Sequence, residues 1–157
     1  MDNYFVLKMI HVLGAVVITG TGAGIAFFMF MAHRSANINA IAVTARHVVL
    51  ADWIFTAPAV LVQFLSGLYL MMKLGYSFTS SWFLAVLALF VFIGLCWIPV
   101  VVIQYKLKAL AEDALQSGVL DPSFHRLMRL WTALGVPAFL AVLIVFWLMI
   151  FKPLSVV

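Results

Sequence analysis

The stretch that decides the fold is residues 82–105, WFLAVLALFVFIGLCWIPVVVIQY, which contains no acid, lysine, arginine or histidine. A helix needs about 20 mostly apolar residues to cross the hydrocarbon core of a bilayer. Three further segments meet this requirement, residues 4–32, 46–72 and 130–151. The sequence therefore predicts an all-α fold, a bundle of four transmembrane helices that forms one integral membrane domain over residues 1–157.

The composition supports a membrane protein and excludes several other classes. Hydrophobic residues make up 67% of the 157 residues and charged residues only 9%, against about 25% charged residues in a soluble domain. The nine lysines and arginines are scattered in ones and twos at the predicted helix ends, so they form no nucleic-acid interface, and membrane lipids with anionic headgroups are the expected partners. Cys96 is the only cysteine and lies in an apolar run, which excludes a disulfide framework and a thiolate metal site.

The basic residues also predict the orientation. The linkers after the first and third spans hold six of them: Arg34, Arg46, Lys106, Lys108, Arg126 and Arg129. The opposite side holds three, Lys8, Lys73 and Lys152. Under the positive-inside rule, both termini are expected outside and the two basic linkers in the cytoplasm. Within the third linker, residues 106–116 are predicted to form a short amphipathic helix that Gly118 ends.

The first span carries His11 on the same face as Gly14, Ala15, Ile18 and Gly22, because these positions recur at helical spacing. A histidine above a glycine-lined face suits a haem ligand, since the flat macrocycle can lie against the helix backbone. Small residues at this spacing are also the usual means of packing helices in a bilayer. His11 is therefore either an iron ligand or a hydrogen-bonding residue between two helices.

The second span carries Asp52, the only acid within any predicted span. At 100° per residue Asp52 shares an arc of about 80° with three other polar residues, Thr56, Gln63 and Ser66. This polar stripe is expected to face the interior of the bundle. The candidate partners of Asp52 are the arginines at the cytoplasmic end, Arg46, Arg126 and Arg129. Asp52 is expected either to form an ion pair that orients the helices or to relay protons as a catalytic residue.

Three prolines and three further histidines complete the candidates. Pro58, Pro99 and Pro137 each free a backbone carbonyl in mid-helix, and such kinks can open a pocket in the bundle.

The histidines near the cytoplasmic surface are His33, His47 and His125, whose spacing matches no zinc motif. Nearby Arg46, Arg126 and Arg129 could hold lipid phosphates or the carboxylates of a porphyrin-like ligand. His11 and His47 are expected near opposite faces of the bilayer, so they cannot ligate one iron.

The chain has no GxSxG, P-loop, HExxH or CxxCH motif, so it offers no support for hydrolase, nucleotide-driven or c-type haem chemistry. Several stretches, among them residues 51–59 (ADWIFTAPA), residues 97–101 (WIPVV), Ser66-Gly67 and Lys152-Pro153, resemble the family called domain of unknown function 2269. That family consists of bacterial four-helix integral membrane proteins. The resemblance covers essentially the whole chain and implies the bacterial inner membrane as its location.

The pattern Lys8-Met9-Ile10-His11 is similar, more distantly, to the Lys-x-x-His of HemJ-type protoporphyrinogen oxidases and CopD-like membrane proteins. The HemJ resemblance implies that His11 is an axial ligand of haem b, the metal centre of such a site. HemJ-type enzymes also rely on a lysine in the third span, which residues 82–105 lack. The resemblance therefore implies haem binding without implying protoporphyrinogen oxidase activity.

Two functions follow from these features. The first is a haem b membrane protein with a redox role, either electron transfer or a quinol- or porphyrinogen-linked oxidoreductase. In it His11 ligates the iron, Gly14 and Gly22 line the macrocycle, and Asp52 handles protons. The second is a non-enzymatic membrane carrier, or an assembly factor for a larger membrane complex or a homo-oligomer.

Overall fold

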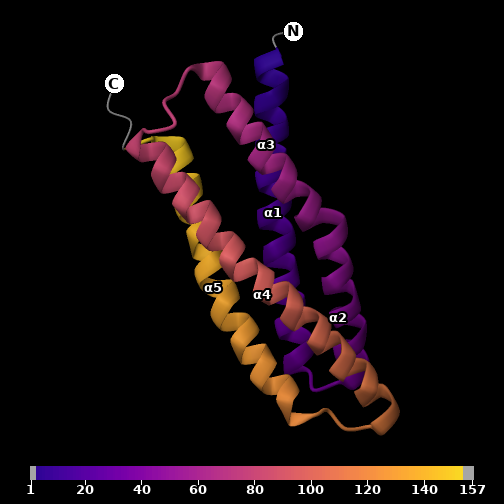
Figure 1. Cartoon of the computed structure of the whole chain (residues 1–157). Coiled ribbons are helices and arrows are strands. Elements are labelled where there is room, and N and C mark those ends of the chain that lie inside the picture. Colours follow the sequence, from indigo (N-terminus) through magenta and orange to yellow (C-terminus); the bar gives the residue numbers. More distant parts are fainter. Residues whose placement is uncertain (1–2, 154–157) are drawn as a thin grey trace.

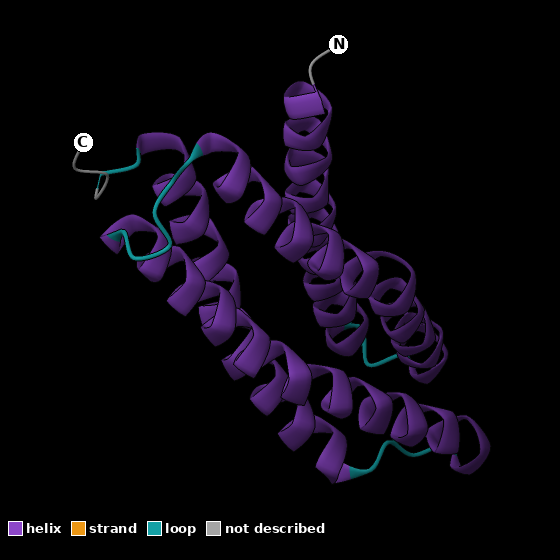
Figure 2. Cartoon of the chain, turned by 45° about the horizontal axis from the view of Figure 1, so that its top comes forward, coloured by secondary structure: helices purple, strands orange, loops and turns teal. Residues whose placement is uncertain are grey.

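The computed structural model describes residues 3–153, and this part of the chain is helical with no strand (Figures 1 and 2). The helices are α1 (Asn3–Arg34), α2 (Ile38–Ala51), α3 (Ala57–Leu74), α4 (Ser81–Ser117) and α5 (Pro122–Phe151). A single π-helical segment, η1 (Asp52–Thr56), joins α2 to α3 into one rod. Four helical rods are long and apolar enough to cross a membrane, which confirms the predicted four-span bundle.

The helices extend beyond the predicted spans at one end of the bundle. The second rod begins at Ile38 and α5 at Pro122, each about 12 Å of helix before the predicted start. Hydropathy locates the segment that lies in hydrocarbon, whereas capping residues end a helix. The side chains of Asn37, Ser80 and Asp121 cap the N-termini of α2, α4 and α5. Gly118 ends α4 with a φ of +73°, so the predicted helix over residues 106–116 is confirmed as the last turns of α4.

The two ends of the bundle differ in what lies there. Both ends of the chain lie at one end, which we call the terminal end (Figure 1). The α1–α2 and α4–α5 loops lie at the other, which we call the loop end. The α4 and α5 helices run side by side along their length, while α1 contacts both α2 and α3.

The larger hydrophobic core lies in the loop half of the bundle. It is built from α1, α2, α4 and α5, with Met29, Ile41, Leu107 and Phe124 almost fully buried. A smaller cluster at the terminal end joins Met71, Trp82 and Leu148, and Trp82 Nε1 donates to the carbonyl of Leu148 at 2.7 Å. The four rods are therefore packed together most closely at the loop half.

The π-helical segment changes how the second rod presents its polar residues. Pro58 has no N–H to donate to the carbonyl of Ile54, and its ring would clash with that carbonyl in a regular helix. The chain instead widens one turn, so that the N–H of Ala57 donates to the carbonyl of Asp52, five residues earlier. One extra residue rotates everything downstream by about 100° relative to a regular helix. The predicted single polar stripe is therefore wrong, because it is divided into two parts that face different helices.

Candidate functional site

The first part of the divided stripe is a buried polar cluster around Asp52, which we call the Asp52 centre. Asp52 is 5% exposed, and its carboxyl faces the polar groups of Thr56, Trp97 and Gln104. Thr56 and Gln104 are buried as well. Asp52 and Thr56 come from η1, and Trp97 and Gln104 from α4. The centre therefore links the second rod to α4.

The Asp52 carboxyl lies within reach of Thr56, Gln104 and Trp97, but these contacts fall short of good hydrogen-bond geometry. Asp52 Oδ2, Thr56 Oγ1, Trp97 Nε1 and Gln104 Oε1 have no partner within hydrogen-bonding geometry. They are four of the six such buried side-chain atoms in residues 3–153. A buried polar group without a partner costs about 1–3 kcal/mol, and in hydrocarbon no bulk water relieves that cost. Four such atoms in one place make this centre the candidate position for a further polar group.

A hollow in the membrane-facing surface lies beside the Asp52 centre. Its volume is about 200 Å³, and both Asp52 and Trp97 line it. The other lining residues are apolar or aromatic: Trp53, Ala57, Ile98, Val101 and Val102. Trp53, Ile98 and Val102 are more than half exposed, so the hollow lies on a surface that the membrane covers. Its lining surface is almost entirely apolar, because Asp52 Oδ2 and Trp97 Nε1 are buried and not exposed to it.

The predicted arginine partners of Asp52 are wrong. Within residues 3–153, Asp52 forms no ion pair, and Arg46 instead pairs with Glu112 through Nε and Oε1 at 2.7 Å. Arg126 and Arg129 are exposed in the first turns of α5. Asp52 is turned inward, whereas a guanidinium near the loop end reaches water at lower cost than it reaches the bundle interior.

The second part of the stripe holds His11 between α1 and α3. His11 Nδ1 lies 2.9 Å from Ser66 Oγ, and His11 Nε2 lies 3.0 Å from Gln63 Nε2. The Ser66 hydroxyl donates its proton to the carbonyl of Val62, so Ser66 Oγ accepts from Nδ1–H. Nε2 is then the unprotonated nitrogen and accepts from the Gln63 amide. We call the three residues His11, Gln63 and Ser66 the α1–α3 clamp.

Two glycines let the helices of the clamp approach closely. A Cβ atom on Gly14 would lie 2.8 Å from Gln63 Oε1, and one on Gly67 would lie 3.2 Å from His11 Cε1. A Cβ on Gly22 would meet nothing within 4 Å, so Gly22 is not part of this contact. The glycine face of α1 thus serves helix packing beside His11, the alternative that the sequence left open.

A haem on His11 does not fit this arrangement. Both ring nitrogens are hydrogen-bonded, and the Gln63 side chain fills the space beside Gly14 where a macrocycle would lie. The other predicted cofactor residues, Arg46, Arg126 and Arg129, lie toward the loop end. His11 lies 23 residues before the end of α1 at that side, about 35 Å along the helix. The structure therefore does not bring the predicted haem-binding residues together.

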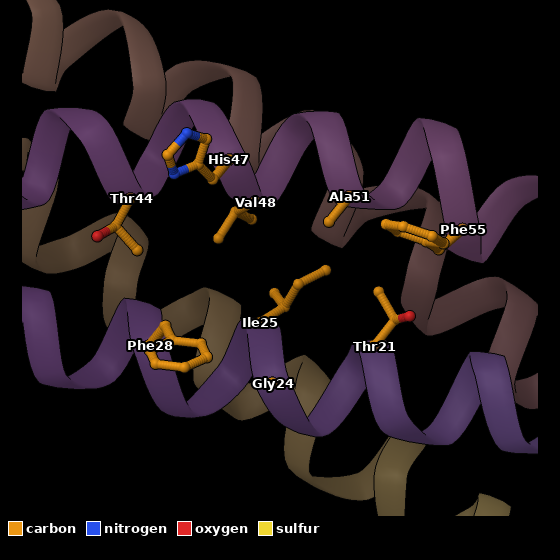
Figure 3. Close-up of a pocket in the computed structure, with 9 residues that line it drawn as sticks. All are labelled: Thr21, Gly24, Ile25, Phe28, Thr44, His47, Val48, Ala51 and Phe55. Atoms are coloured by element: carbon orange, nitrogen blue, oxygen red, sulfur yellow. The ribbon is translucent and has the colours of Figure 1, made fainter.

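The remaining histidines lie in two separate places. His33 Nε2 and His125 Nδ1 are 2.9 Å apart, which joins the end of α1 to the start of α5. His47 does not join them and lines a groove between α1 and α2 (Figure 3). Residues 3–153 contain no group of three or more histidines, cysteines or acids that could hold a metal ion.

The groove between α1 and α2, which we call the α1–α2 groove, has a volume of about 480 Å³. Figure 3 shows its two walls, with Thr21, Gly24, Ile25 and Phe28 on one helix and residues of the second rod on the other. The residues of the second rod are Thr44, His47, Val48, Ala51 and Phe55. Asp52 is not among the lining residues, so the groove and the Asp52 centre are separate features.

Two members of the Asp52 centre were not singled out from the sequence. Gln104 is the only side-chain amide within residues 82–105, and Trp97 precedes Pro99 by two residues. A polar side chain in an otherwise apolar span is expected to seek a buried partner. That signal identifies Gln104 as a site residue, but it does not say which span it faces.

A comparison with family models gives one match, described as "Predicted integral membrane protein (DUF2269)", over residues 5–153. No curated protein and no solved structure matches the chain.

Proposed function

The chain belongs to the DUF2269 family of predicted integral membrane proteins, and we propose that it binds a small, membrane-dissolved molecule of the quinone class at the Asp52 centre. The observation that carries the proposal is the set of four unpartnered buried polar atoms at Asp52, Thr56, Trp97 and Gln104. The hollow beside them supports it, because Asp52 and Trp97 line a space that faces the membrane.

A quinone or quinol head has the polar groups that this hollow lacks. When the side chains of Asp52 and Trp97 rotate toward the hollow, a ring carbonyl accepts from Trp97 Nε1–H, and the neutral Asp52 carboxyl donates to a quinone carbonyl or accepts from a quinol hydroxyl. The ring itself packs against Ile98, Val101 and Val102, which line the hollow. Most of such a site is apolar, and a few polar groups fix the orientation of the ligand, as in small-molecule sites generally. The proposal concerns binding, as by a carrier, and requires no covalent or redox step.

The proposed orientation of the protein in the membrane rests on the distribution of lysines and arginines between the two ends of the bundle. We place the protein in a bacterial inner membrane with both termini outside and the basic loop end in the cytoplasm, under the positive-inside rule. In this orientation the α1–α3 clamp lies in the outer half of the bundle, because His11 is about 12 Å along the helix from its start at Asn3.

The test is a fluorescence titration of the protein in lipid nanodiscs with decylubiquinone, a short-chain quinone that quenches tryptophan. Trp53 and Trp97 line the hollow, so saturable quenching of part of the emission is expected. Asp52→Leu removes a hydrogen bond between neutral groups, which contributes about 0.5–1.5 kcal/mol. The dissociation constant should therefore rise several-fold, up to about tenfold, and Trp97→Phe should remove much of the quenched signal.

The matched control is Asp113→Leu, which changes an exposed acid near the loop end of α4. It should leave the dissociation constant unchanged. Quenching that never saturates, or that saturates equally in wild type and Asp52→Leu, contradicts the proposal.

A redox protein with haem b on His11 is the second candidate, and one observation favours it. Nδ1–H is held by Ser66 while Nε2 keeps its lone pair, the arrangement typical of histidines that ligate metals. Against it, Gln63 holds that lone pair, so ligation requires α3 to move away from α1. The test is an optical spectrum of the purified protein. A Soret band that His11→Ala removes supports this candidate, and a colourless protein excludes it.

A further inference from the structure

The α1–α2 groove has the length of one leaflet of a bilayer. Its longer wall, on the second rod, runs from Thr44 to Phe55, eleven steps that cover about 16 Å of helix. Its α1 wall runs from Thr21 to Phe28, seven steps that cover about 10 Å. The hydrocarbon core of a bilayer is about 30 Å thick, so one leaflet contributes about 15 Å. Both helices that form the groove are membrane spans. An extended acyl chain of one leaflet therefore matches the groove in length.

The interior of the groove is apolar and open to the membrane. Ile25, Val48 and Ala51 line it between the helices, and Phe28 and Phe55 are 63% and 51% exposed. Gly24 gives the groove its depth, since a Cβ atom there would meet nothing within 4 Å. Figure 3 labels Gly24 on α1, among the residues of that wall of the groove.

The end of the groove nearer the loops is polar. Thr44 and His47 lie there (Figure 3), and His47 forms no hydrogen bond within residues 3–153. The loop end as a whole is basic, with the six lysines and arginines named above against three acids, Glu112, Asp113 and Asp121. Anionic lipid headgroups gather at such surfaces. Two of the three polar side chains that line the groove, Thr44 and His47, therefore lie on the side where an anionic headgroup is attracted, and Thr21 lies toward the other end.

We infer that the α1–α2 groove is a binding site for one acyl chain of an anionic phospholipid from the leaflet at the loop end. The chain lies along Gly24 between the two helices, and the headgroup accepts a hydrogen bond from His47 or Thr44. This inference does not depend on the quinone proposal, because the groove and the hollow at Asp52 share no lining residue.

The experiment compares two glycine variants of the same helix. Gly24→Leu fills the groove, whereas Gly20→Leu adds the same side chain to α1 at an open position that does not line it. Each protein is extracted from nanodiscs of equal parts phosphatidylglycerol and phosphatidylcholine, and native mass spectrometry counts the retained phospholipid. Wild type and Gly20→Leu should retain one phosphatidylglycerol, and Gly24→Leu should retain at least tenfold less.

Two further variants complete the test. Thr21→Leu, which narrows the groove from the same wall, replaces Gly24→Leu if that variant does not insert. His47→Leu should keep a bound phospholipid but lower the preference for phosphatidylglycerol over phosphatidylcholine several-fold. Equal retention by wild type and the groove-filling variants overturns the inference. So does a change from dimer to monomer in Gly24→Leu with unchanged phospholipid, because the groove would then bind a second copy of the chain.

Discussion

The α1–α3 clamp makes a quantitative prediction about His11. His11→Ala removes two hydrogen bonds, to Ser66 and to Gln63. Hydrogen bonds between membrane helices contribute about 0.6 kcal/mol on average and about 1.7 at most. We therefore expect His11→Ala to lower the free energy of unfolding by about 1–2 kcal/mol, the sum of two such bonds.

A double-mutant cycle with Gln63→Ala isolates one of these bonds. Gln63→Ala alone also removes Gln63 Oε1, a buried acceptor without a partner, so its own cost is expected to be small. The coupling energy between the two substitutions should nevertheless be about 0.6 kcal/mol, because only the cycle separates the bond from the other changes.

The assay is equilibrium unfolding in mixed micelles, with helix content followed by circular dichroism as the fraction of denaturing detergent rises. The control cycle pairs His11→Ala with Thr132→Ala, whose hydroxyl bonds the carbonyl of Met128 within α5, and it should show no coupling. A coupling energy of zero between His11 and Gln63 refutes the clamp.

Three further predictions can be checked with the same material. Gly14→Ala places a methyl group 2.8 Å from an amide oxygen of α3, so it should lower the midpoint of unfolding, while Gly20→Ala should not. Arg46→Ala should cost less than about 1 kcal/mol in the same assay, because its ion pair with Glu112 is exposed to solvent and screened by salt. Hydrogen bonds from the hydroxyl and the N–H of Ser123 lower the pKa of Asp121 at the cap of α5. Its contribution to stability is therefore present above about pH 3.9, the usual value for aspartate, and is lost as the pH falls through the lower folded value. Asp121→Asn keeps the cap, so this acid-dependent loss should disappear from thermal melts recorded from pH 5 to pH 2.

Much of the fold follows from the sequence because the bilayer imposes strict requirements. A segment such as residues 82–105 cannot be placed in water, and a spanning segment must satisfy its backbone within a helix. The same reasoning identifies Asp52 and His11 as residues that need buried partners. Both are turned toward neighbouring helices, as their cost in lipid requires.

The partners themselves could not be predicted, for two physical reasons. Pro58 adds one residue to the turn at η1, and a rotation of about 100° separates side chains that a regular helix would align. Arg46 was expected to neutralise Asp52 on the basis of charge alone. A guanidinium near the loop end has water and Glu112 within reach, so it does not enter the bundle. Which side chains become partners depends on the packing between helices, and a single sequence contains no pattern that reveals this packing.

The most direct measurement of the central claim is photo-crosslinking with a quinone analogue that carries a diazirine on its ring, followed by peptide mapping. If the Asp52 centre holds a quinone-class molecule, labelling should concentrate on residues 52–57 and 97–102, and excess decylubiquinone should suppress it. Asp52→Leu should reduce this labelling several-fold, in line with the loss of one hydrogen bond between neutral groups. Labelling that is spread evenly over the lipid-facing helices, or that Asp52→Leu leaves unchanged, contradicts the account.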